Sequence, residues 1–188
     1  LADFRVLAAG DIEDIIHLKA GKWKYYKEHE LGHELGLTAA EIKQAVQSLD
    51  DKGKVIILAD GSIVSEEKLK ILEDTVSKII EEYHSQNPMV DGIPKRELLS
   101  RIKEYQHIED DKLGQAIISK FLDSGMLEDK EKTISLAGFK VEFSNEQLAL
   151  MDEIKKMYDK AGVETIKNEY IYEFVGDKNI ASAIQTEL

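Results

Sequence analysis

The sequence predicts a mainly α-helical fold that carries small β-hairpins. Over most of the chain apolar residues recur at intervals of three and four, as they do on the buried face of an amphipathic helix. Two short stretches, residues 55–64 and 126–136, break this pattern with apolar runs on either side of a turn, which is typical of hairpins. The chain has 188 residues, enough for one domain or for two or three small ones.

An arrangement of helices followed by a hairpin occurs twice in the sequence, and its first copy ends at residue 64. Residues 38–41, Thr-Ala-Ala-Glu, form a capping box, in which the Thr hydroxyl and the Glu carboxylate satisfy free amides at a helix start. Gly53 ends this helix. The apolar residues that follow the capping box at helical spacing are Ile42, Ala45, Val46 and Leu49. The apolar runs 55–58 and 62–64 flank Asp60-Gly61, a strong hairpin signal. Helix, turn, helix and hairpin is the order of a winged-helix domain.

A second copy follows the same order. Apolar residues from Leu113 to Leu122 predict a helix that ends at Gly125. Short runs at 126–127 and 133–136 then flank a charged turn, which predicts a second wing. The fold class expected is therefore mainly α with small β-wings (α+β), built as tandem winged-helix domains.

A second internal match sets the boundaries. Residues 65–74 align with residues 144–153, because each stretch has a Ser N-cap, acidic residues near the helix start and apolar residues on a 3.6-residue period. The predicted domains are 1–65 for winged helix 1, 66–143 for winged helix 2 and 144–188 for the start of winged helix 3. The third unit stops after its last helix, before any wing, so we expect it to be truncated.

The stretch from His29 to His33 spells H-E-x-x-H, the pattern in which two imidazoles hold zinc and the Glu is the general base of a peptidase. On a helix Leu31 faces away from His29, and Leu31 and Leu35 form the natural core face, so both histidines point to solvent. A metzincin needs its third His at the position of Ala39. A Glu later in the sequence could still be the third zinc ligand, so a zinc peptidase is kept as a remote alternative function. We predict no metal site and no catalytic residue.

The net charge is −12, from 25 basic and 37 acidic residues, and a surface of this sign repels phosphate backbones. The three candidate recognition helices, within 38–53, 109–125 and 177–188, each hold more acidic than basic residues. A DNA-binding transcription regulator is therefore the alternative function and not the first. There is no cysteine and no P-loop motif, so we expect a cytoplasmic setting and no bound nucleotide.

One stretch, residues 17–27, interleaves four lysines with three aromatic residues. This composition is typical of surfaces that stack bases and bind phosphates. The candidates for a weak RNA contact are Lys19, Lys22, Trp23, Lys24 and Lys27. The favoured alternative is a turn between two helices with packed aromatic rings and solvated lysines, because lysine stems commonly cover apolar surface.

Residues 79–102, which we call the joint, read IIEEYHSQNPMVDGIPKRELLSRI and contain both prolines of the chain. Pro88 disfavours the helical conformation for Asn87 and so ends a helix. The Asp-Gly pair at 91–92 predicts a turn, and a β-branched substitution of Gly92 would be strained if its φ is positive. Pro94 suits the first position of the next helix.

The joint resembles the C-terminal extension of the bacterial selenocysteine-specific translation elongation factor, the SelB family. The residues that carry the resemblance are Tyr83-His84, Asn87-Pro88, Gly92, Lys95 and Leu98. In that family a GTPase and tRNA-binding domains come first and four winged helices follow. The last winged helix binds the mRNA hairpin, the SECIS element, that recodes UGA.

The resemblance implies that this chain is a fragment comprising the first two winged helices and part of the third. It would act as an arm that links the GTPase and tRNA-binding part to the hairpin-binding winged helix. Its partners, through the full-length protein, would be the ribosome, selenocysteyl-tRNA and the SECIS hairpin, and GTP and Mg would bind only elsewhere in the parent protein. We expect the fragment to be no enzyme, to hold no cofactor and not to bind RNA specifically by itself.

Overall fold

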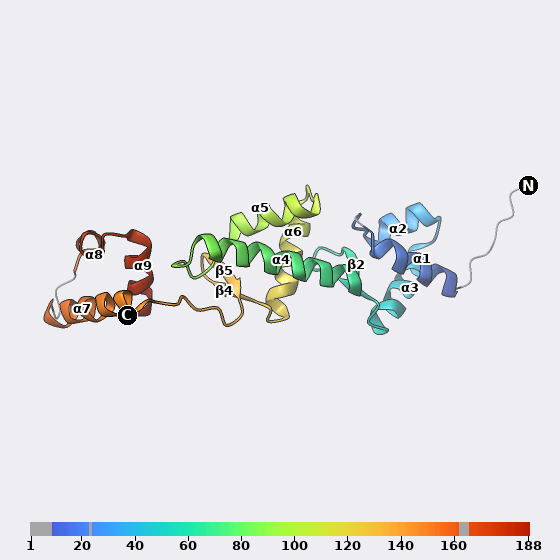
Figure 1. Cartoon of the computed structure of the whole chain (residues 1–188). Helices are drawn as coiled ribbons and strands as arrows, with labels where there is room; N and C mark the ends of the chain where they lie inside the picture. The colour runs from blue at the N-terminus through green and yellow to red at the C-terminus, as the bar shows by residue number, and fades with distance from the viewer. Residues whose placement is uncertain (1–8, 23, 162–165) are drawn as a thin grey trace, which may run out of the picture. The chain divides into compact units, whose positions relative to one another are not determined.

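The computed structural model describes residues 9–22, 24–161 and 166–188 (Figure 1). The chain forms two compact units, the first from residues 1–79 and 96–127 and the second from residues 80–95 and 128–188. Helices dominate both, and the strands form small antiparallel sheets, as the sequence predicts. No helix in the described ranges has the length and hydropathy that a membrane span requires.

The first unit begins with three helices and a hairpin. Their bounds are α1 Ala9–Ala20, α2 Glu28–Leu35, α3 Ala39–Asp51, β1 Val55–Ile57 and β2 Ile63–Ser65. The predicted capping box opens α3, since Thr38 Oγ1 accepts the Glu41 N–H at 3.3 Å and the Glu41 carboxylate accepts the Thr38 N–H at 2.8 Å. The two strands are antiparallel, with Val55 opposite Ser65.

A single apolar core joins these elements. Its fully buried residues come from α1, α2, α3 and the hairpin: Ile16, Leu31, Ile42, Val46, Leu49, Val55 and Ile63. Leu31 is 1% exposed and Leu35 packs against the same core, as helical spacing predicts. The opposite side of α2 is therefore left for solvent.

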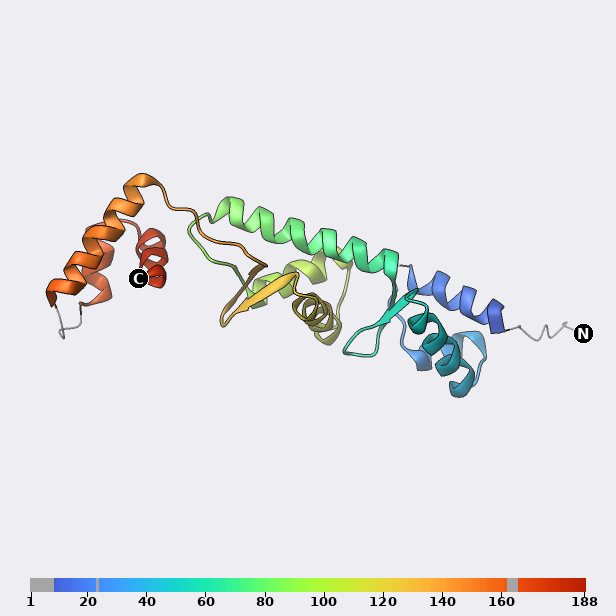
Figure 2. The ribbon, with the colours of Figure 1, turned by 90° about the horizontal axis from the view of Figure 1, so that it is seen from below.

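Helix α4, Glu66–Gln86, is one continuous helix (Figure 2). The Ser65 hydroxyl accepts the Lys68 N–H at 3.1 Å and so caps the helix start, as expected from the internal match. At the other end the helix stops before Asn87, where Pro88 predicts its end. Its buried apolar residues are Leu72, Val76, Ile79 and Ile80.

The following elements form a second set of helices and a second wing. Their bounds are β3 Ile93–Pro94, α5 Lys95–Gln106, α6 Asp111–Asp123, β4 Leu127–Lys130 and β5 Thr133–Leu136. The strand order is β3-β5-β4. Strand β3 is absent from the sequence prediction, which placed Pro94 at the first position of a helix. Pro94 instead ends an edge strand, where its missing N–H costs no sheet hydrogen bond, and the helix begins at Lys95.

The prediction for Gly92 is corrected by its surroundings. Gly92 is not among the glycines with positive φ. A Cβ at this position would lie only 2.7 Å from the carbonyl oxygen of Ile134 and 2.9 Å from its carbonyl carbon. Glycine is needed here because the backbone of strand β5 approaches closely, and not because of a left-handed turn.

The second unit ends with three more helices. Their bounds are α7 Asn145–Ala161, α8 Asn168–Val175 and α9 Lys178–Glu187. A capping box opens α7, since the Ser144 hydroxyl accepts the Gln147 N–H at 3.3 Å and the Gln147 amide oxygen accepts the Ser144 N–H at 2.8 Å. Buried residues of all three helices share one core: Ile154, Ile171, Ala181 and Ile184. The domain boundaries at residues 65 and 143 stay a prediction.

Candidate nucleic-acid interface

The lysine-rich stretch 17–27 is the end of α1 and the turn before α2. Lys19 Nζ lies 2.6 Å from Glu34 Oε1, and Lys24 Nζ lies 4.0 Å from Glu34 Oε2. Both ammonium groups also lie over the buried ring of Tyr26, at 5.1 and 4.5 Å from its centroid. The hydrogen bond between Lys19 and Glu34 lowers the pKa of the carboxyl and raises the pKa of the amine. Lys19 and Lys24, two of the residues predicted to contact RNA, thus both lie beside the Glu34 carboxylate and over the Tyr26 ring.

The other candidates lie apart from this pair. Lys27 Nζ is 3.4 Å from Asp60 Oδ2, and the Asp60 side chain is only 5% exposed. Asp60 also accepts the Ser62 N–H at 3.0 Å, so Lys27 supports the hairpin turn. Lys22 is exposed, and within the described ranges no ion pair of its side chain is found. Trp23 lies outside the described residues.

A buried lysine that the sequence prediction missed lies beneath this turn. Lys68 on the first turn of α4 is 5% exposed, its Nζ lies 3.4 Å from the ring centroid of Tyr25, and it donates a hydrogen bond to the Lys22 carbonyl. Burial lowers the pKa of Lys68 to about 8, and burial also raises the pKa of Tyr25. The signal was present in the sequence, because position 68 is one helical turn before the buried Leu72.

The H-E-x-x-H histidines lie on the exposed face of α2. His29 and His33 are both exposed and line a hollow together with Lys24, Glu30 and Glu34. The Glu30 carboxylate is engaged, since it accepts the Lys27 N–H at 2.9 Å. Among the residues that the structure describes, no three His, Cys, Asp or Glu side chains are grouped to hold a metal. The outward orientation of the histidines is as expected, and the absence of a metal site stays a prediction.

The described residues of the candidate recognition helices include few lysines, which are Lys43 on α3, Lys112 and Lys120 on α6, and Lys178 on α9, with Lys52 directly after α3. A shallow hollow on α3 is lined by Ala40, Lys43, Gln44, Gln47, Ser48, Asp51 and Lys52. Lys52 is bound to Glu13 at 2.5 Å, which leaves Lys43 as the cation of this face. On α6 the acidic Asp111 pairs with Lys103. These faces are poorly suited to hold a phosphate backbone.

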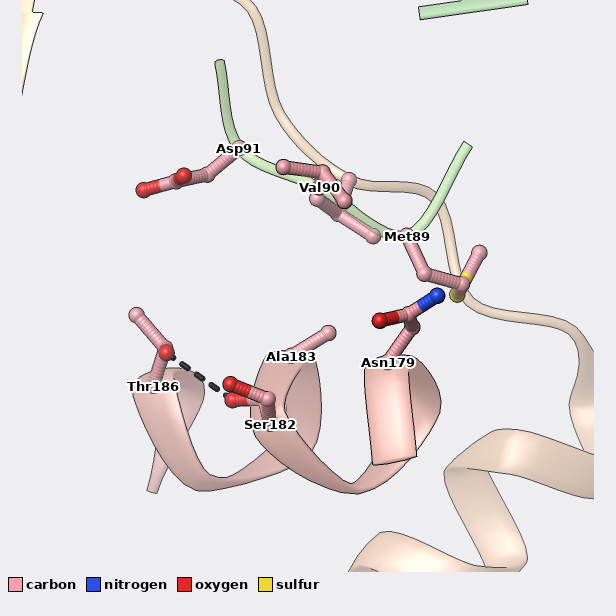
Figure 3. Close-up of a pocket in the computed structure, with 8 residues that line it drawn as sticks. Met89, Val90, Asp91, Asn179, Ser182, Ala183 and Thr186 are labelled. Carbon is pink, nitrogen blue, oxygen red and sulfur yellow. Dashed lines mark hydrogen bonds between the residues drawn. The ribbon is translucent and has the colours of Figure 1, made fainter. Parts of the chain in front are cut away.

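A hollow in the second unit lies between α9 and the loop after α4 (Figure 3). Asn179, Ser182 and Thr186 of α9 face it, opposite Asp91 of the loop (Figure 3). The Asp91 carboxylate accepts a hydrogen bond from the Thr133 hydroxyl at 3.2 Å. The lining residues include no lysine or arginine, so they provide no cationic side chain for a phosphate.

The joint owes its structure to the residues that carry the family resemblance. The His84 ring is 8% exposed and stacks on Phe139, with ring centroids 3.6 Å apart and an angle of 26° between planes. The Asn87 amide donates to the Tyr83 carbonyl at 3.0 Å and closes the last turn of α4. Burial lowers the pKa of His84, with the backbone of Val90 opposing and Lys130 adding to the shift. The motif therefore fixes the end of α4 against the segment that follows β5.

Comparison with known proteins identifies part of the chain. Residues 78–136, which include the joint and the second wing, match the family model described as "Elongation factor SelB, winged helix". A solved structure of the mRNA-binding domain of elongation factor SelB from E. coli in complex with SECIS RNA is similar in fold, with a TM-score of 0.51 and 11% sequence identity. The match covers 68% of this chain and 98% of that chain. No curated protein matches the chain significantly.

These matches confirm the predicted fold class and the resemblance to SelB. The family model covers the stretch that carries the motif residues from Tyr83 to Leu98. The structural match extends the winged-helix fold over most of the chain. Residues 78–136 thus match the SelB winged-helix model, and the chain is similar in fold to the mRNA-binding domain of SelB.

Proposed function

We propose that this chain belongs to the C-terminal arm of a selenocysteine-specific elongation factor. The arm joins the GTPase and tRNA-binding part to the winged helix that binds the SECIS hairpin. The observation that carries the proposal is the family match over residues 78–136, because that stretch contains the joint and not only generic winged-helix spacing. The partners reached through the full-length protein are the ribosome, selenocysteyl-tRNA and the SECIS hairpin, in the cytoplasm. The arm itself is non-catalytic and holds no cofactor.

The charges favour a connecting role over hairpin recognition by this segment alone. Several lysines are tied to carboxylates of the same chain: Lys19 to Glu34, Lys27 to Asp60, Lys52 to Glu13 and Lys95 to Asp129. A lysine in such a pair contributes less to phosphate binding, because the carboxylate must first be released. The observation that favours hairpin recognition instead is that the solved SelB domain of similar fold is in complex with SECIS RNA.

Contacts inside the first unit connect residues that are far apart in the sequence. The Tyr25 hydroxyl donates to the Gln106 amide oxygen at 3.4 Å, which connects the turn before α2 to the end of α5. Lys68 packs on the same Tyr25 ring.

The test removes the arm from the full-length factor. Residues 9–188 would be replaced by a Gly/Ser linker, with the GTPase part and the hairpin-binding winged helix kept intact. The expected result is loss of UGA recoding in cells, while GTP hydrolysis and hairpin binding measured on the purified variant persist. Recoding at the unaltered level would overturn the proposal. A DNA-binding regulator, the alternative function, is tested by binding of this chain to duplex DNA in place of RNA.

A further inference from the structure

Helix α8 (Figure 1) carries two aromatic side chains that the core beneath it leaves exposed. Tyr170 is 57% exposed and Phe174 is 38% exposed, and they lie one helical turn apart, so the two rings are neighbours on the surface. Glu169 and Glu173, which precede them, are exposed as well. We propose that these four side chains, here called the α8 face, bind a basic amphipathic segment of a partner protein. The inference does not depend on the proposed role of the chain in UGA recoding.

Helices α2 and α5 can be compared with α8 position by position. Each of the three helices ends directly before a residue with a left-handed φ, and these residues are Gly36 at 66°, His107 at 51° and Gly176 at 79°. Five positions earlier each helix has a buried apolar residue, and these residues are Leu31, Ile102 and Ile171. The same face of each helix is therefore turned to its core, and the positions beside that face correspond.

The positions of the two rings are held by other kinds of residue in α2 and α5. In α2 they are Glu30 and Glu34, whose carboxylates bind groups of the same chain at 2.9 and 2.6 Å. In α5 they are Arg101 and Tyr105, and Arg101 pairs with Glu97 at 2.6 Å. Of these three helices only α8 presents two aromatic side chains there. Packing of this kind of helix therefore does not require them, and a pair of exposed rings is typical of the anchors of a binding surface.

The charges of α8 select the partner. With Lys167 at its N-cap, α8 has one basic and two acidic residues, Glu169 and Glu173, which gives −1. Within the described ranges neither carboxylate is held in an ion pair. Lysine or arginine side chains of a partner would pair with these carboxylates and lie over the ring faces, while its apolar residues would cover the ring edges.

The same carboxylates disfavour two other occupants. An RNA strand could stack its bases on the rings, but its phosphates would be repelled by Glu169 and Glu173. A second copy of this chain, placed symmetrically, would bring like carboxylates together across the contact. A basic protein segment is the occupant that suits both the rings and the charges.

The experiment titrates the whole chain into a fluorescent amphipathic peptide that has a leucine stripe flanked by arginines. A second peptide has the same stripe flanked by glutamates. Anisotropy should show binding of the arginine peptide, weakening as salt is raised, and no binding of the glutamate peptide.

Two double variants separate the rings from the charges. Tyr170→Gln with Phe174→Gln keeps the net charge and should weaken binding of the arginine peptide about tenfold, because both anchors are lost. The matched control is Tyr105→Gln, which removes an equally exposed tyrosine from the corresponding position of α5 and should leave binding unchanged. Glu169→Gln with Glu173→Gln should also weaken binding and should flatten its salt dependence. Circular dichroism should show unchanged helix content for all three, since the replaced side chains are exposed.

Four outcomes would overturn the inference. One is no binding of the arginine peptide, and another is binding that the loss of both rings leaves unchanged. Tighter binding of a single-stranded RNA than of the arginine peptide, lost with the rings, would assign the α8 face to RNA. Self-association of the unaltered chain that disappears with the rings, seen by sedimentation, would assign it to a second copy.

Discussion

Replacement of Gly92 by alanine should destabilise the second wing, because the new methyl group has no room. The Cβ would lie 2.7 Å from the Ile134 carbonyl oxygen and 2.9 Å from its carbonyl carbon. Both atoms belong to the backbone of β5, whose residue Ile134 is paired with Ile93 next to the substitution. The clash can therefore be relieved only by moving the sheet, and not by a side-chain rotation.

The magnitude follows from two opposing terms. Forcing an extra methyl group into a packed site costs about 1–3 kcal/mol. Alanine in place of glycine recovers about 0.4–1 kcal/mol by reducing the conformational entropy of the unfolded chain. We expect a net loss of about 1–2 kcal/mol, which corresponds to about 2–4 °C in Tm for each kcal/mol in a chain of this size.

The matched control is Gly21→Ala. A Cβ at position 21 would meet its nearest atom, Ser65 Oγ, at 3.4 Å, an ordinary contact distance. Urea unfolding followed by circular dichroism should show a lower midpoint for Gly92→Ala and an unchanged or slightly higher midpoint for Gly21→Ala. Equal midpoints for the two variants would refute the close approach between Gly92 and strand β5.

Three further substitutions, the last with a matched control, test other parts of the structure by the same assay. Burial lowers the pKa of His84 below its ordinary 6.5. The stability that the neutral imidazole contributes is therefore complete above about pH 6.5 and is lost as the pH falls below that value. The variant His84→Phe should lose less free energy of unfolding than the unaltered chain between pH 7.5 and pH 5.5. Lys68→Met should leave stability at pH 7 unchanged or raise it, because it removes a buried ammonium group. A loss of more than about 1 kcal/mol would show that the contacts of this group with the Tyr25 ring and the Lys22 carbonyl are together net stabilising. Thr38→Ala should cost about 1 kcal/mol of stability, because it removes the cap of α3. The control Thr75→Ala loses only a hydrogen bond to the Ile71 carbonyl within α4 and should cost nothing. Equal losses for the two variants would contradict the capping role of Thr38.

Local signals were sufficient for most of the fold. The capping residues Thr38, Ser65 and Ser144 start helices where the sequence predicts them, because a cap is a contact between residues three apart. Pro88 ends α4 for an equally local steric reason. The exposure of the histidine pair follows from helical spacing relative to Leu31.

Contacts between distant residues could not be predicted in this way. The need for glycine at position 92 depends on Ile134, which approaches only after the sheet has formed. Strand β3 has two residues and no pattern of its own, so its pairing with β5 leaves no sequence signal. The candidate lysines looked like one cluster in the sequence, but Lys27 turns to Asp60, a partner more than thirty residues away.

The measurement that tests the arm proposal most directly is the specificity of this chain for a SECIS hairpin. A fluorescent hairpin and the same hairpin with a mutated loop would be titrated with the chain at pH 8.0, at low and at physiological salt. We predict weak binding that is equal for both RNAs and disappears at physiological salt, because the net charge of −12 opposes any phosphate contact. Submicromolar binding at physiological salt that is lost when the loop is mutated would contradict the account. It would make this chain a hairpin-recognising module in its own right.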